Sequence, residues 1–167
     1  MIDAIWVDNL IKVFEYEDKL YAQILEKAES KTDIIVKGDV DSLQETNLKE
    51  QKIINELSKL NNAREQIIAQ IARKVGKKPG ELNVSYLVSI LPEDKAKKLS
   101  AVRDSLKETI EKLKYRNDIN QKLLNNAIDY INFSLNIIMQ PAPQVTQYGR
   151  KGFEQQINGG NVLDIKY

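Results

Sequence analysis

Apolar residues recur every three or four positions from residue 2 to residue 139, which is the spacing of long amphipathic helices. The pattern then stops, because Pro141 and Pro143 cannot continue a helix and the segment after them is polar and contains glycine. The sequence therefore predicts an all-α fold, an elongated antiparallel three-helix bundle or coiled coil with a short connecting helix. Residues 1–139 are expected to form this bundle, and residues 140–167 are expected to form an extended C-terminal tail.

Glycine and proline divide the helical part into elements. Gly38 suits the end of a first helix, and the Asp39 carboxylate can accept hydrogen bonds from the free N–H groups that open a second one. A tight reversal there makes the first two helices antiparallel neighbours. The run from Gly76 to Gly80 ends the second helix, and Pro92 suits the first turn of the last one. The expected helices cover residues 2–36, 40–75, 83–91 and 93–139, each to within a few residues.

The composition excludes most enzyme chemistry. The chain has no cysteine and no histidine, which removes thiolate nucleophiles, zinc sites built from these residues and the usual nucleophile–histidine arrangements. Carboxylates such as Glu17 lie among lysines, in surroundings that give no reason for the raised pKa of an acid–base catalyst. We therefore expect no catalytic residue, no cofactor and no metal site, and a protein that is not an enzyme.

Charge and hydropathy bear on partners and location. The 25 lysines and arginines nearly balance the 24 aspartates and glutamates, so the net charge of +1 makes nucleic acid an unexpected partner. The apolar runs are far shorter than the roughly 20 residues of a membrane-spanning helix, and the first residues show no secretory signal. The chain is expected to be soluble and cytoplasmic, without membrane insertion.

Polar residues interrupt the apolar stripes of the helices. They are Glu17 in the first helix, Asn47, Glu50, Asn61 and Arg64 in the second, and Asn117 and Asn120 in the last one. We interpret them as a structural polar core, in which mutual hydrogen bonds fix helix register, in preference to direct contacts with a partner. The sequence leaves open whether Arg64 pairs with Asn117 or with Asn9.

Three aromatic residues near the helix ends are candidates for a groove. If the first and last long helices run parallel, as an up-down-up path requires, we expect Trp6, Tyr130 and Phe133 to cluster. Such a cluster is either a hydrophobic binding groove or part of the ordinary core, and the sequence does not decide between them.

The chain resembles the FlgN family of flagellar export chaperones over nearly its whole length. The resemblance is carried by the order and spacing of several short pieces. These are Leu20 to Val36, Gly38-Asp39-Val40-Asp41-Ser42-Leu43, Lys49-Glu50-Gln51-Lys52-Ile53-Ile54, Ala63-Arg64-Glu65, Arg116-Asn117, Asn120 to Leu124, Tyr130-Ile131 and Tyr148-Gly149-Arg150-Lys151-Gly152.

Membership in this family implies a cytosolic chaperone that binds the helical terminal regions of flagellar hook-associated proteins. It implies that such a chaperone prevents their premature association and delivers them to the export gate of the flagellar type III apparatus. The alternative is a self-associating structural coiled-coil protein without chaperone activity. The candidate partner-binding residues are Trp6, Tyr130, Phe133, Tyr148, Gly149, Gly152, Phe153, Val162, Leu163, Ile165 and Tyr167.

The last apolar residues of the tail, Val162 to Tyr167, have no assigned counterpart in the resemblance. We interpret them as a separate apolar anchor. Two arrangements remain open, since the tail can dock on its own bundle or on a neighbouring molecule and so support self-association.

Overall fold

The computed structural model describes residues 4–139, 147–148 and 154–155. Its elements, in chain order, are α1 (Ala4–Lys37), α2 (Val40–Val75), the 3₁₀ turn η1 (Pro79–Glu81), α3 (Val84–Ile90), α4 (Glu93–Met139), β1 (Gln147–Tyr148) and β2 (Glu154–Gln155). The chain divides into two compact units, residues 1–124 and 125–167. The predicted all-α class and helical bundle are confirmed.

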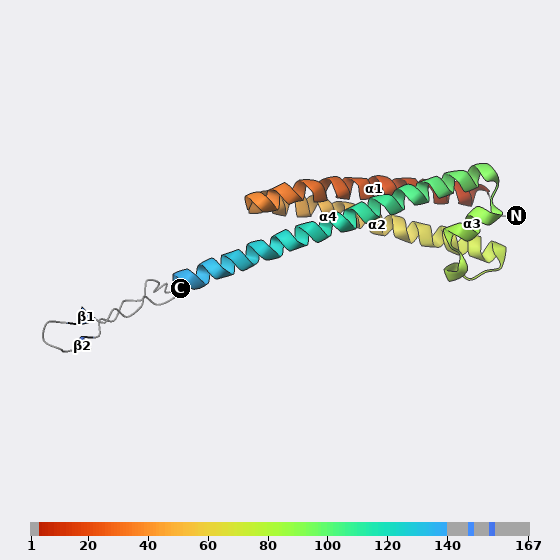
Figure 1. Ribbon diagram of the computed structural model, residues 1–167. Coiled ribbons are helices and arrows are strands. Elements are labelled where there is room, and N and C mark those ends of the chain that lie inside the picture. Colours follow the sequence, from red (N-terminus) through yellow and green to blue (C-terminus); the bar gives the residue numbers. More distant parts are fainter. Residues whose placement is uncertain (1–3, 140–146, 149–153, 156–167) are drawn as a thin grey trace. The chain divides into compact units, whose positions relative to one another are not determined.

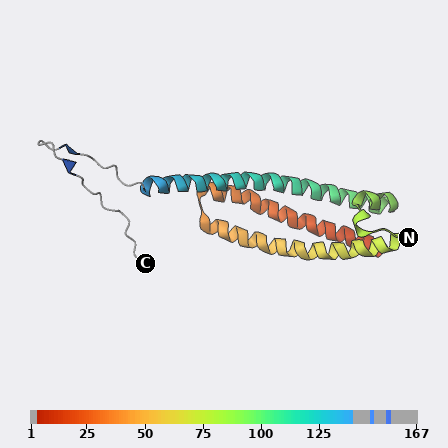
Figure 2. The ribbon, with the colours of Figure 1, turned by 90° about the horizontal axis from the view of Figure 1, so that it is seen from below.

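The first unit is built from three long helical segments that lie side by side (Figures 1 and 2). Helix α2 returns antiparallel to α1, and the first part of α4 then runs in the same direction as α1. Two side-chain contacts show that α1 and α4 run parallel, because they advance along both helices in the same direction. Asp8 forms an ion pair with Lys95, and Asp18 accepts hydrogen bonds from the hydroxyls of Ser105 and Thr109.

The reversal between α1 and α2 has the predicted chemistry. Gly38 adopts φ +67°, a left-handed conformation that costs glycine little, and its N–H donates to the Ile35 carbonyl at 3.1 Å. The next residue, Asp39, accepts a hydrogen bond from the backbone N–H of Ser42 at 3.0 Å and another from its hydroxyl at 2.7 Å. These bonds satisfy groups that would otherwise be unpaired at the start of α2.

Short elements close the opposite end of the first unit. Helix α2 ends at Gly76, which has φ +69°, and the N–H of Lys77 donates to the Ala72 carbonyl at 3.0 Å. After η1, the Asn83 side chain accepts from the N–H of Tyr86 at 2.7 Å and caps α3. The connecting helix predicted from the apolar residues of this stretch is therefore α3, and its buried Leu87 packs into the core.

The core of the first unit consists of two clusters of buried apolar residues. The larger one joins α1, α2, α3 and α4, and its fully buried members include Leu10, Ile71 and Leu99. The smaller one contains Ile24, Ala28 and Leu113, with partly buried residues of α1 and α2 around them. The buried residues of α4 follow a seven-residue interval, as in coiled-coil packing: Leu99, Leu106, Leu113 and Asn120.

The second unit contains the end of α4 and a short antiparallel ladder that the sequence did not predict. In β1 and β2, Gln147 is opposite Gln155 and Tyr148 is opposite Glu154. Two residues per strand are too few to show the alternating pattern by which strands are recognised in a sequence. The division into a bundle of residues 1–139 and a tail of residues 140–167 stays a prediction.

Candidate partner-binding surface

A buried ion pair crosses between α1 and α2. Arg64 Nη1 donates to both carboxylate oxygens of Glu17, at 2.9 and 2.8 Å, and Arg64 Nη2 donates to Asn61 Oδ1 at 2.5 Å. The Glu17 side chain is 3% exposed, whereas that of Arg64 is 30% exposed. The guanidinium carbon also lies 5.7 Å from the ring centroid of Phe14, within the range of a cation–π contact.

Burial changes the acidity of Glu17. Removal from water raises the pKa of its carboxyl above the usual value, and the attraction and hydrogen bonds of Arg64 oppose this rise without cancelling it. The expectation that the surroundings of Glu17 give no reason for a raised pKa is wrong. The cause is that the side chain lies on the inner face of α1, although its sequence neighbours are polar.

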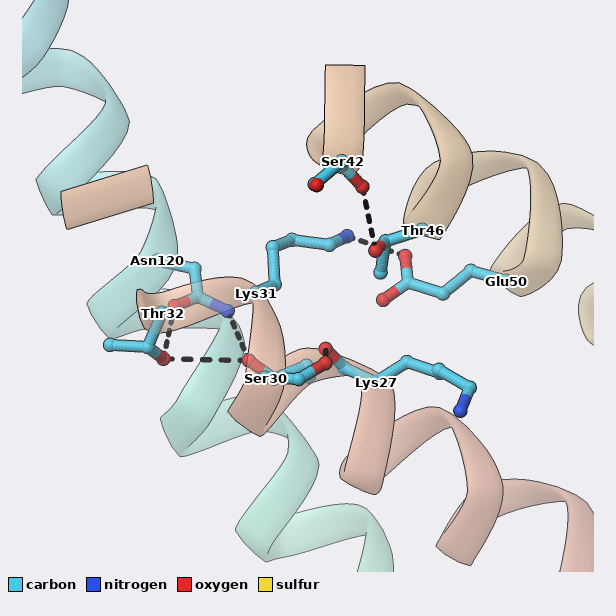
Figure 3. A network of polar contacts seen from close by, with 9 residues as sticks. Lys27, Ser30, Lys31, Thr32, Ser42, Thr46, Glu50 and Asn120 are labelled. Carbon is cyan, nitrogen blue, oxygen red and sulfur yellow. Dashed lines mark hydrogen bonds and ion pairs between the residues drawn. The ribbon is translucent and has the colours of Figure 1, made fainter. Parts of the chain in front are cut away.

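A second polar contact joins α1 to α4. The buried Asn120 side chain donates through Nδ2 to the Ala28 carbonyl at 2.7 Å, and the Thr32 hydroxyl donates to Asn120 Oδ1 at 2.7 Å (Figure 3). Every polar side-chain atom that is buried within the described ranges has a hydrogen-bond partner. The predicted structural role of Asn120 therefore has direct geometric support.

Two more polar contacts lie near the reversal, one between α1 and α2 and one within α2. Lys31 of α1 and Glu50 of α2 form an ion pair at 2.5 Å, and both side chains are largely buried. Within α2, the hydroxyl of the buried Thr46 donates to the Ser42 carbonyl at 2.8 Å (Figure 3). Sequence reasoning missed Thr32 and Thr46, because threonine in a helix gives no distinctive signal.

The structure corrects the expected partners within the polar core. Arg64 pairs with Glu17, and its contacts include neither Asn117 nor Asn9, which are both exposed. Asn61 and Arg64 do contact one another, as expected, but Asn117 is not part of the core. Glu17 was among the polar residues that interrupt the predicted stripes, and its opposite charge is the signal that points to it as the partner of Arg64.

The structure does not bring Trp6, Tyr130 and Phe133 together. Trp6 is partly buried and packs against the larger core cluster. Tyr130 is 72% exposed and Phe133 is 63% exposed. The expected cluster is wrong because of the axial register of the helices. In two parallel helices that begin at the same level, the start of α1 lies beside the start of α4 and not beside its end.

The exposed apolar residues concentrate at the end of α4. Within Asn125–Met139 the only charged residue is Asp129. Half of the large apolar residues that are exposed in the described part of the chain fall within the last twelve positions of α4: Ile128, Tyr130, Ile131, Phe133, Leu135, Ile137, Ile138 and Met139. A helix segment that is apolar and nearly uncharged is unusual for a free surface and typical of a docking site.

The candidate residues of the tail fall into two groups. Gly149, Gly152, Phe153, Val162, Leu163, Ile165 and Tyr167 lie outside the described residues. Tyr148 belongs to β1, opposite Glu154.

No group of three or more aspartates and glutamates in the part of the chain that the structure describes is arranged to hold a metal ion. None of the helices described is both long and apolar enough to cross a membrane. The carboxylates of Glu17 and Asp18 accept hydrogen bonds from residues of neighbouring helices, Arg64 and Ser105.

Comparison with known proteins identifies the family. A family model described as FlgN protein matches residues 1–156, which include the whole bundle, the apolar end of α4 and both strands. No curated protein and no solved structure matches the chain. The resemblance inferred from the sequence is confirmed, and this chain belongs to the FlgN family of flagellar export chaperones.

Proposed function

We propose that this chain is a cytosolic chaperone for flagellar hook-associated proteins. It binds their helical terminal regions, prevents their premature association and delivers them to the export gate of the flagellar type III apparatus. Family membership supports the export role in general terms. The observation that carries the proposal for this chain is the exposed apolar end of α4, residues 125–139.

The chemistry of this surface matches an amphipathic helical cargo. Such a cargo exposes an apolar face before it assembles, and an apolar helix face can cover it temporarily. Each of the eight exposed side chains can contribute about 1–2 kcal/mol when it is covered, while association itself costs at least about 4 kcal/mol. The surface therefore supports reversible binding, which a chaperone that must release its cargo requires.

The direct test is a calorimetric titration of the full chain with a hook-associated protein, intact and without its terminal helical segments. Binding is expected only with the intact cargo. Phe133→Glu should weaken it at least about tenfold, because a charge would be buried against an apolar partner. Asn132→Glu is the matched control on the adjacent residue and should change affinity little. Equal binding by cargo without its terminal segments would contradict the proposal.

The tail is proposed to contribute to cargo capture. Deletion of residues 140–167 is expected to leave the helical circular dichroism signal nearly unchanged, because the long helices lie before residue 140. The same deletion should weaken cargo binding. Unchanged affinity would remove the tail from the proposed binding surface while leaving α4 in it.

A self-associating structural protein is the alternative, because an apolar helix end can also bind a second copy of itself. Light scattering separates the two functions. A constitutive dimer that has no affinity for hook-associated proteins would favour the structural alternative.

A further inference from the structure

The inner face of α4 has a repeating layout in the first unit. Leu99, Leu106, Leu113 and Asn120 are buried at intervals of seven residues. Around Leu113, the core includes residues of both α1 and α2, among them Ala28 and Leu57. Two helices therefore contribute to the core that this face of α4 enters.

The same series continues along α4 into the second unit, where it reaches Ala127 and Ser134. These small residues would allow close approach of a partner, and the Ser134 hydroxyl is already satisfied by the Tyr130 carbonyl at 2.9 Å. Larger apolar residues flank the small ones. Ile131 and Ile138 form one flank, and Tyr130 and Ile137 form the other, and all four are more than half exposed.

The exposed apolar surface is too wide for a single helix. Successive residues of an α-helix are rotated by 100° about its axis. When residues 125–139 are projected down the axis of α4, an apolar sector of about 240° runs from the direction of Phe133 to that of Met139. Asn126 and Ser134 are the only polar residues in this sector. Asp129 and Asn132 belong to the polar strip on the remaining side. One packed helix covers a stripe of roughly 100°, so it would leave more than half of this surface in water.

We infer that the partner of this surface presents two helices side by side, one against each flank. The inference rests on the proposed function and specifies the form of the cargo. The earlier part of the same face supports two occupants, because the core around Leu113 already contains residues of both α1 and α2. The two helices should be nearly uncharged and apolar at heptad spacing where they meet Ala127 and Ser134.

The test uses the full chain and a hook-associated protein that carries both of its terminal helical segments. Ile131→Glu places a charge on one flank, Tyr130→Glu places one on the other, and Asn132→Glu is the control on the polar strip. Both flank variants are expected to weaken binding at least about tenfold, and the control less than about twofold. Removal of one terminal segment from the cargo should abolish the effect of one flank variant and preserve that of the other.

Three outcomes would overturn the inference. Sensitivity to one flank alone would show a single-helix partner and would leave the proposed function intact. A dimer of the unmodified chain that both flank variants dissociate in the absence of cargo would assign the surface to a second copy. Failure of the unmodified chain to bind any hook-associated protein would reject the proposed function as well. Circular dichroism checks the fold of each variant, which should be unaffected because the substituted side chains are exposed.

Discussion

Substitution of Arg64 by methionine is predicted to destabilise the bundle by about 2–3 kcal/mol. Removal of one partner from a buried ion pair costs roughly 3–5 kcal/mol, because the remaining charge is left without compensation. Glu17 is 3% exposed and would keep little solvation, but the 30% exposure of the Arg64 side chain gives water partial access to the site. The expected cost therefore lies at the lower end of that range or just under it.

The predicted loss depends on pH in a defined direction. The folded-state pKa of Glu17 is already raised by burial, and Arg64 is the group that opposes this rise. Without Arg64 the folded pKa should rise further. A carboxyl with a raised folded pKa contributes most below its unfolded pKa, and this contribution is lost as pH rises through the folded value. The deficit of Arg64→Met relative to the parent should therefore be smaller near pH 4.5 than at pH 7.

Urea unfolding followed by circular dichroism at both pH values measures these differences. Lys97→Met is a suitable control, since Lys97 and Glu93 form an ion pair with both side chains at least 75% exposed, worth at most about 0.5 kcal/mol. The double substitution Glu17→Met with Arg64→Met should recover most of the loss, because an apolar pair of similar size needs no compensation.

Two results would refute this reasoning. A deficit of less than about 1 kcal/mol for Arg64→Met would mean that Glu17 finds water or another partner in the folded state. A double variant less stable than Arg64→Met would mean that the pair contributes net stability beyond its desolvation cost.

Three further substitutions test the polar contacts and the reversal. Asn120→Ala should cost about 1–3 kcal/mol in urea unfolding, because it removes the bond to the α1 backbone and the acceptor of the Thr32 hydroxyl. Gly38→Ala should cost about 1 kcal/mol by the same measurement, from the left-handed backbone alone, since no atom lies within 4 Å of an added methyl group. Asp39→Ala should lower the melting temperature at pH 7. The hydrogen bonds from Ser42 lower the pKa of Asp39, so its contribution is present above the unfolded pKa and lost as pH falls through the folded value, and the variant should approach the parent below about pH 4.

The helical architecture was predictable because its signals are local. The three-to-four spacing identifies the long helices, and the Gly38-Asp39 reversal and the ending at Gly76 follow from residues adjacent to each boundary. The short ladder of β1 and β2 was not predictable, because it depends on pairing between two segments that carry no strand pattern.

The candidate site was predictable only in part. Tyr130 and Phe133 were selected from the sequence and are exposed at the end of α4, but Trp6 was grouped with them wrongly. Trp6 was grouped with them because the axial register of α1 and α4 was assumed wrongly, and not because an aromatic residue was the wrong type to select. The width of the apolar surface was also missed, because a stripe defined by one residue per turn does not show how far apolar residues extend around the helix.

Axial register also explains why polar residues lie within this core. Apolar residues at heptad spacing fix which face of a helix turns inward, but a slip of seven residues would preserve that face. The same slip would separate Glu17 from Arg64 and Asn120 from the Ala28 carbonyl, and would leave buried polar groups without partners. The two contacts thus penalise the alternative registers that the apolar pattern allows. They act on different helix pairs, α1 with α2 and α1 with α4, so together they fix all three long helices of the first unit.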